Sequence, residues 1–229
     1  MKTKIRGISS MATRQVLADL VAAFERESAC AVTIESVGGV DAARRVQAGE
    51  AFDVVILASD AIDKLIAAGR LDAGSKVDLV HSGVAVAVRA GAAQPDLGSE
   101  EAVKQAVLSA RNLSYSTGPS GVALARLFER WGIADEIQSR IVTPPPGIPV
   151  GSLVASGEVE LGFQQLSELI NLAGITVVGP LPPAIQITTT FSAGLCPDSA
   201  QPEAVRSLLA FLSSPATADA KRRQGMDPA

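Results

Sequence analysis

The sequence predicts an α/β protein in which helices pack on mainly parallel sheets. Short runs of β-branched and aliphatic residues alternate with amphipathic helical runs, which is the pattern of consecutive strand–helix units. Hydrophobic residues make up 47% of the 229 residues and aromatic residues only 3%, so alanine, valine, leucine and isoleucine must form the core. A core of this composition suits a sheet that is buried on both faces.

The first part of the chain contains three predicted strand–helix pairs. We expect strands at residues 4–8, 31–35 and 53–57, and helices at residues 11–27, 41–48 and 59–69. The first helix has an apolar face, because hydrophobic residues recur at Val16, Leu17, Leu20 and Phe24. Ser59 is expected to be the N-cap of the third helix, which ends at a glycine.

The alternation continues to the end of the chain. Strands are predicted at residues 83–88, 112–115, 159–163, 175–178 and 184–190. A helix that begins after Ser99 has two glutamates in its first turn, where the helix dipole favours acidic side chains. Further helices are predicted at residues 120–131, 150–156 and 164–171, and two more follow residue 201.

Charge and composition exclude several classes of function. The net charge is −4 and there is no block of basic residues, which argues against nucleic acid or an anionic membrane surface as a partner. No apolar run is long enough to cross a membrane. Residues 1–8 are too short and too polar for a signal peptide. We therefore expect a periplasmic protein if a signal was trimmed, and a cytoplasmic one if Met1 is the natural start.

Cysteine usage indicates neither a metal site nor a disulfide framework. Cys30 and Cys196 are the only cysteines and lie far apart in the sequence. We expect two buried thiols, and their redox state stays open.

Four segments of the chain form a recognisable series when they are taken in order. They are a strand that ends at Ser9-Ser10, a strand that ends at Gly38-Gly39, the stretch QAGEAFDVVILAS and the stretch STGPSGVALARLFERWG, to which VELGFQQLSEL is the partner. In this order they resemble the molybdate-binding proteins of ABC importers. The resemblance covers nearly the whole chain. It implies a type II periplasmic-binding-protein fold with two lobes, residues 1–80 plus 190–229 and residues 81–189, joined by crossover strands near residues 80–83 and 184–190. It also implies a ligand cleft between the lobes, and an ABC-transporter membrane component as a partner.

The physical chemistry of strand–helix turns independently predicts an anion site. Ligands of parallel sheets bind beyond the carboxyl ends of strands, where helix N-termini offer free N–H groups. Serine adds a hydroxyl donor at such turns, and glycine lets a ligand approach the backbone. The alternative is that the serines are ordinary helix caps. The predicted ligand-binding residues are Ser9, Ser10, Arg14, Gly38, Gly39, Ser59, Ser116, Ser120, Gln164 and Gln165.

The chain departs from the family pattern in a way that bears on the ligand. Molybdate binders of this type show serines at the positions of Gly38 and Gly39, and a tyrosine near Gln164. Each lost hydroxyl removes a donor that is worth about 1–3 kcal/mol when buried. The amides of Gln164 and Gln165 suit a larger, asymmetric anion, so a di- or tricarboxylate is expected rather than molybdate. Arg14 is either a clamp for a carboxylate or a solvated surface residue.

The sequence contains few residues that could act as acid–base catalysts. The weak candidates for an acid–base group are Glu35, Asp60 and His81, and no cofactor-binding or metal-binding motif is present. A solute-binding protein that closes on a small anion is the leading interpretation. The alternative is an isomerase on the same fold, similar to aconitate isomerase, that acts on an unsaturated polycarboxylate by proton transfer. A third reading, a cytoplasmic effector sensor, lacks a DNA-binding helix pair.

Overall fold

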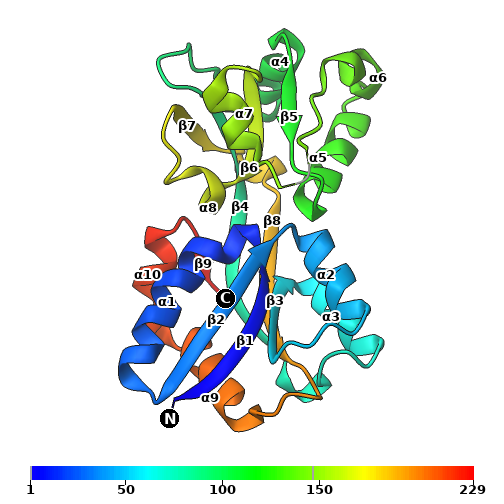
Figure 1. The fold of residues 1–229 in the computed structure, drawn as a ribbon. Helices are drawn as coiled ribbons and strands as arrows, with labels where there is room; N and C mark the ends of the chain where they lie inside the picture. The colour runs from blue at the N-terminus through cyan, green and yellow to red at the C-terminus, as the bar shows by residue number, and fades with distance from the viewer. Residues whose placement is uncertain (1, 146) are drawn as a thin grey trace. The chain divides into compact units, whose positions relative to one another are not determined.

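The computed structural model describes residues 2–145 and 147–229, so Met1 and Pro146 lie outside the described residues. The chain forms two compact units (Figure 1). Unit 1 comprises the chain up to Ser82 together with Thr190–Ala229, and unit 2 comprises Gly83–Thr189. Strands β4 (Val77–Arg89) and β8 (Thr188–Leu195) contribute residues to both units. The predicted α/β class with two crossover strands is confirmed.

The sheet of unit 1 has the strand order β2-β1-β3-β8-β4, and β9 pairs with β4. Its remaining strands are β1 (Thr3–Ser10), β2 (Cys30–Val37), β3 (Val54–Ala58) and β9 (Asp227–Pro228). Strand β1 is parallel to both β2 and β3, whereas β3 and β8 are antiparallel. The carboxyl ends of β1, β2 and β3 therefore lie at the same edge of the sheet.

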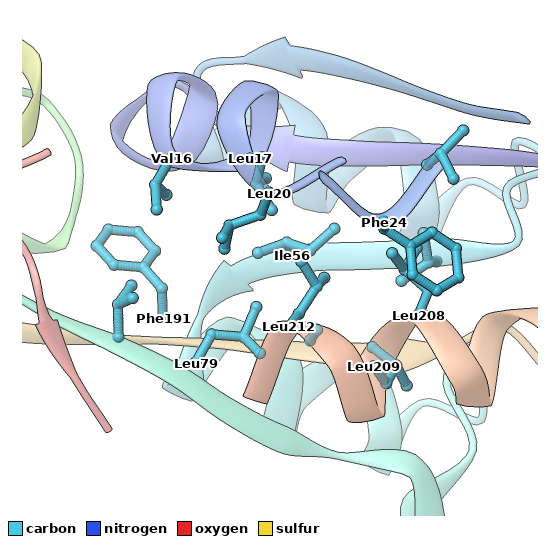
Figure 2. Close-up of a cluster of buried hydrophobic side chains, with 14 of the residues drawn as sticks. Val16, Leu17, Leu20, Phe24, Ile56, Leu79, Phe191, Leu208, Leu209 and Leu212 are labelled. Carbon is cyan, nitrogen blue, oxygen red and sulfur yellow. The ribbon is translucent and has the colours of Figure 1, made fainter. Parts of the chain in front are cut away.

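Helices cover both faces of the unit 1 sheet. They are α1 (Arg14–Glu27), α2 (Gly39–Gln47), α3 (Ser59–Ala67), α9 (Pro202–Ser213) and α10 (Ala218–Arg223). Side chains of α1 and α9 converge on Ile56 of β3 (Figure 2). Val55 and Leu57, which flank Ile56 in the strand, pack instead with α2 and α3. Strand β3 is thus buried on both faces, which explains its continuous run of apolar residues.

Unit 2 is built around β4, β5 (Leu113–Tyr115), β6 (Leu161–Gln165) and β7 (Ile175–Pro180). Strands β5 and β6 are parallel, while β4 is antiparallel to β6 and to β7. Its helices are α4 (Glu100–Ser109), α5 (Pro119–Arg130), α6 (Ala134–Ile137), α7 (Val150–Ser156) and α8 (Leu166–Leu169). Short 3-10 turns complete the two units at Met11–Thr13, Ala73–Ser75, Gln138–Arg140, Pro183–Ile185 and Pro215–Thr217.

One aromatic side chain organises the core of unit 2. Phe128 of α5 is 1% exposed. Its ring centroid lies 5.8 Å from that of Tyr115, 5.9 Å from that of Trp131 and 6.2 Å from that of Phe163. The contacts join the C-terminal half of α5 to Tyr115 of β5 and Phe163 of β6, and so hold α5 against these strands.

Three local predictions can be compared with the structure. Ser99 caps α4 as predicted, because its Oγ accepts a hydrogen bond from the Ala102 N–H at 3.1 Å. The prediction that Ser59 is an N-cap is wrong, since Ala58 occupies the cap position and Ser59 is the first residue of α3. The strand expected at residues 184–190 begins later, at Thr188, because Pro183 opens a 3-10 turn.

Candidate functional site

Hydroxyl groups gather at the edge of unit 1 where β1 and β2 end. Ser9 and Ser36 are direct neighbours in the parallel register, and their Oγ atoms lie 2.8 Å apart. Ser9 is fully buried and is also 3.3 Å from the Ser10 carbonyl, to which it can donate. If Ser9 donates there, Ser36 donates to Ser9, and both protons are used within the fold.

Ser10 differs, because its hydroxyl acts as an acceptor. Its Oγ accepts the Ala12 N–H at 3.2 Å and caps the 3-10 turn that leads into α1. The cap interpretation is therefore correct for this serine. The cap does not use the proton of the hydroxyl, and among the described residues no acceptor receives it. Ser10 can cap the turn and donate to an anion at the same time.

The other predicted residues of unit 1 surround this group without joining its hydrogen bonds. A Cβ at Gly39 would lie 3.8 Å from the Ser10 Cβ, while a Cβ at Gly38 would meet nothing within 4 Å. Neither glycine has a positive φ, so neither backbone nor packing requires a glycine there. Arg14 is exposed and forms no ion pair with any residue that the structure describes, and Ser59 makes no side-chain hydrogen bond there either.

A tight turn joins β5 to α5 in unit 2 and holds the second pair of predicted serines. The Oγ atoms of Ser116 and Ser120 lie 3.0 Å apart. The turn closes so tightly that a Cβ at Gly121 would lie only 1.5 Å from the Ser116 carbonyl oxygen. A pocket at this turn is lined by Tyr115, Ser116, Thr117, Gly121, Val122, Ala125, Ile141 and Thr143. Because Gly121 has no side chain, the carbonyl oxygen of Ser116 can approach the first turn of α5 this closely.

Both predicted glutamines occupy the last positions of β6 and are buried. The Gln164 Oε1 accepts the Gly151 N–H at 3.0 Å, and its Nε2 donates to the Glu168 Oε1 at 2.9 Å. The Gln165 Nε2 donates to the Thr189 Oγ1 at 2.9 Å, while its Oε1 is buried and has no partner among the described residues.

Glu168 is a candidate site residue that the sequence analysis missed. It lies on α8, directly after β6, and burial raises the pKa of its carboxyl to about 7 against the lowering effect of the Gln164 amide. A signal was available in the sequence, because Glu168 is the only charged residue between Glu160 and Asp198. A carboxyl whose pKa is shifted in this way is a candidate functional group.

The three acid–base candidates named from the sequence have different surroundings. Glu35 forms a bidentate ion pair with Arg45 at 2.7 and 2.9 Å, and this hydrogen bonding lowers the pKa of Glu35. The Asp60 Oδ2 lies 3.7 Å from the Lys64 Nζ on the surface of α3. The His81 Nδ1 lies 3.0 Å from the Thr190 Oγ1. The partners of these three side chains, Arg45, Lys64 and Thr190, are not among the predicted ligand-binding residues.

Cys30 and Cys196 are free and buried, and burial raises the pKa of the Cys196 thiol to about 12. In the part of the chain that the structure describes, no three histidine, cysteine or acidic side chains come together as metal ligands. No helix within the described ranges combines the length and the apolar character that a membrane crossing requires.

Comparison with known proteins gives a relative for almost the whole chain. A curated protein of Pseudomonas sp, named aconitate isomerase, is 37% identical over 232 residues, which span 99% of this chain and 88% of that protein. The family model described as bacterial extracellular solute-binding protein matches residues 5–227.

Solved structures show the same fold. The periplasmic molybdate-binding protein of Azotobacter vinelandii superposes with a TM-score of 0.80 at 22% identity, covering 97% of this chain and 98% of that one. The sulfate-binding protein of Mycobacterium tuberculosis H37Rv also gives 0.80, at 15% identity and with 99% and 87% covered. The predicted resemblance to type II periplasmic binding proteins is confirmed. Because the family model spans nearly every residue, the chain belongs to the bacterial extracellular solute-binding protein family.

Proposed function

We propose that this protein isomerises aconitate, an unsaturated tricarboxylate, by moving a proton between two of its carbons. The observation that carries the proposal is the 37% identity to a protein named aconitate isomerase, which extends over 99% of this chain. Identity at this level, spread over both units, is well above the 22% shared with the molybdate-binding protein.

Polar groups within unit 1 support a carboxylate as the ligand. The unused proton of Ser10 can be donated to an anion, and the guanidinium of Arg14, which forms no ion pair with a described residue, suits bidentate binding of a carboxylate. Gly38 and Gly39 leave room where molybdate binders show serines.

Unit 2, taken by itself, contains the Ser116–Ser120 hydroxyl pair and the amides of two buried glutamines. Hydroxyl and amide donors of this kind also suit carboxylates.

Exchange of substrate hydrogen with solvent tests the proposal directly. The purified protein is incubated with trans-aconitate in deuterated water, and the carbon-bound hydrogens are followed by NMR. We expect the cis isomer to appear, with deuterium on the carbons that lose and regain a proton. A buffer control and heat-unfolded protein give the background rate. Absence of both the cis isomer and deuterium exchange above that background, at substrate concentrations that raise the melting temperature, would show a binding protein and contradict the proposal.

Binding of a small anion without chemistry is the second candidate, and the family match favours it. In that case the partner would be the membrane component of an ABC transporter. A thermal-shift series separates the two ligand classes. We expect tricarboxylates to raise the melting temperature at lower concentration than molybdate or sulfate does, whichever candidate holds.

Ser10 supplies a matched pair of variants for the ligand contact. Ser10→Ala is expected to reduce stability by about 1 kcal/mol through the lost cap and also to weaken aconitate binding by about 5- to 50-fold. Ser99→Ala removes an equivalent cap at the start of α4. It is expected to reduce stability by a similar amount and to leave affinity unchanged. Calorimetric titration of both variants checks the difference, and equal affinities would remove Ser10 from the site.

A further inference from the structure

We infer that Glu168 is the residue that takes the proton from the substrate and returns it, an assignment that rests on the isomerase activity proposed above. The inference comes from the position of this carboxyl and from the polar groups around it. It replaces the weak candidates Glu35, Asp60 and His81.

No ion pair neutralises Glu168 among the residues that the structure describes. It follows β6 directly and sits on α8, which packs against β6 and β7. Those two strands, and helix α7, contain no ionisable side chain, and Glu168 is the only one on α8. A carboxylate with no cation beside it keeps its basicity, unlike Glu35, which Arg45 neutralises.

The hydrogen bond that Glu168 receives is fixed in direction by the backbone of α7. The Gly151 N–H donates to the Gln164 Oε1 at 3.0 Å, so the amide must present its NH₂ to the Glu168 Oε1. Gly151 makes this possible, because a Cβ there would lie 2.6 Å from the Leu172 Cδ2 and 3.0 Å from the Leu169 Cδ2. One carboxyl oxygen is thereby held in place, and this hydrogen bond leaves the other oxygen free to exchange a proton.

Two further properties of this segment favour a ligand here. Burial raises the pKa of Glu168 to about 7, so both of its forms are populated near neutral pH, as an acid–base catalyst requires. The neighbouring Gln165 Oε1 and Ser167 Oγ are buried and find no partner among the described residues. Unsatisfied buried polar atoms are uncommon, and a polar ligand would provide the missing partners.

The proposed step is balanced with this one group. Glu168 as a carboxylate accepts a proton from the methylene carbon of aconitate. The electrons of that C–H bond are delocalised over the neighbouring C=C bond, which gives an allylic carbanion that the substrate carboxylates stabilise. The new C=C bond forms at the former methylene carbon, and the remaining electron pair lies on the former vinyl carbon. Protonated Glu168, whose proton exchanges with solvent, then gives a proton to the former vinyl carbon. The double bond has moved by one position, and the carboxyl has returned to its first state.

The test compares Glu168→Gln with Glu160→Gln in the full-length protein. Glu160 lies just before β6, and Arg111 binds it through its backbone N–H at 2.8 Å and its Nε at 3.0 Å. We expect Glu168→Gln to lower the rate of deuterium exchange by about 10²- to 10⁴-fold, with the Kd for aconitate changed by less than about 10-fold. Glu160→Gln is expected to keep the wild-type rate. Glu168→Asp should recover part of the lost rate.

The pH dependence of kcat/KM distinguishes a catalytic role of Glu168 from a purely structural one. The wild type is expected to show a limb in kcat/KM with an apparent pKa near 7, and loss of the Gln164 hydrogen bond in Gln164→Met should shift that limb to higher pH. Wild-type exchange that persists in Glu168→Gln would overturn the assignment, and loss of exchange in Glu35→Gln, Asp60→Asn or His81→Ala would name another base. If the wild type itself forms no cis isomer, the proposed isomerase activity is wrong, which is a separate outcome.

Discussion

Replacing Gly121 by alanine is expected to lower the free energy of unfolding by at least about 3 kcal/mol, because the new Cβ has no space. It would lie 1.5 Å from the carbonyl oxygen of Ser116 and 2.7 Å from its carbonyl carbon. Both atoms are backbone, so a side-chain rotation cannot relieve the clash. The turn must open, and the hydrogen bond between Ser116 and Ser120 is expected to be lost with it. Urea denaturation measures the change.

Gly118 offers the control for this experiment. It is the N-cap of α5 with φ −83°, and a Cβ there would meet nothing within 4 Å. Gly118→Ala is expected to cost less than about 1 kcal/mol. Denaturation midpoints that coincide for the two variants would show that the Ser116–Gly121 turn is not held by this close approach.

Replacing Glu168 by glutamine is expected to stabilise the folded protein above neutral pH by about 1–3 kcal/mol. The folded-state pKa of about 7 lies above the ordinary value of 4.5, because burial disfavours the carboxylate. Stability from this group is therefore fully present below about pH 4.5 and is lost as the pH rises through 7. A glutamine does not ionise, so Glu168→Gln keeps this stability at pH 8. The variant would be a more stable protein with less activity.

Glu160 provides a control for which the pH dependence of stability has the opposite sign. The Arg111 backbone N–H is the main cause that lowers the pKa of Glu160, so its carboxylate stabilises the fold above its ordinary pKa. Glu160→Gln is expected to lose stability at neutral pH and to differ little from the wild type in acid. Free energies of unfolding measured from about pH 3 to about pH 8.5 check both variants. Curves for Glu168→Gln and the wild type that run parallel over this range would contradict the buried, uncompensated carboxyl.

The elements that local patterns predicted well are those whose packing follows a single period. Helix α1 shows its apolar face in the sequence, and strand β3 is a continuous apolar run because helices cover both of its faces. Strand β8 was expected too early, since the β-branched run after Pro183 first makes a 3-10 turn. Ser59 looked like a cap, but α3 begins one residue earlier than its serine suggested.

The candidate site was only partly visible in the sequence, for a physical reason. Serines at strand ends can be recognised locally, and the parallel register then brings Ser9 and Ser36 together. The properties of Glu168 depend instead on β7 and on Gly151 of α7, which are not its neighbours in the chain. Burial and the lack of a cation are properties of the folded unit, so no local pattern could assign the pKa of Glu168.

The way in which the chain passes through the two units has a consequence for synthesis on the ribosome. Unit 2 is one continuous segment, whereas unit 1 needs Thr190–Ala229 before its sheet is complete. Until β8 emerges, β3 has an unpaired edge made of VVILA, an apolar strand of the kind that pairs with other chains. A nascent chain therefore carries an aggregation-prone edge from the synthesis of β3, which ends at Ala58, until the emergence of β8, which ends at Leu195. Premature termination anywhere in unit 2 would leave that edge permanently open.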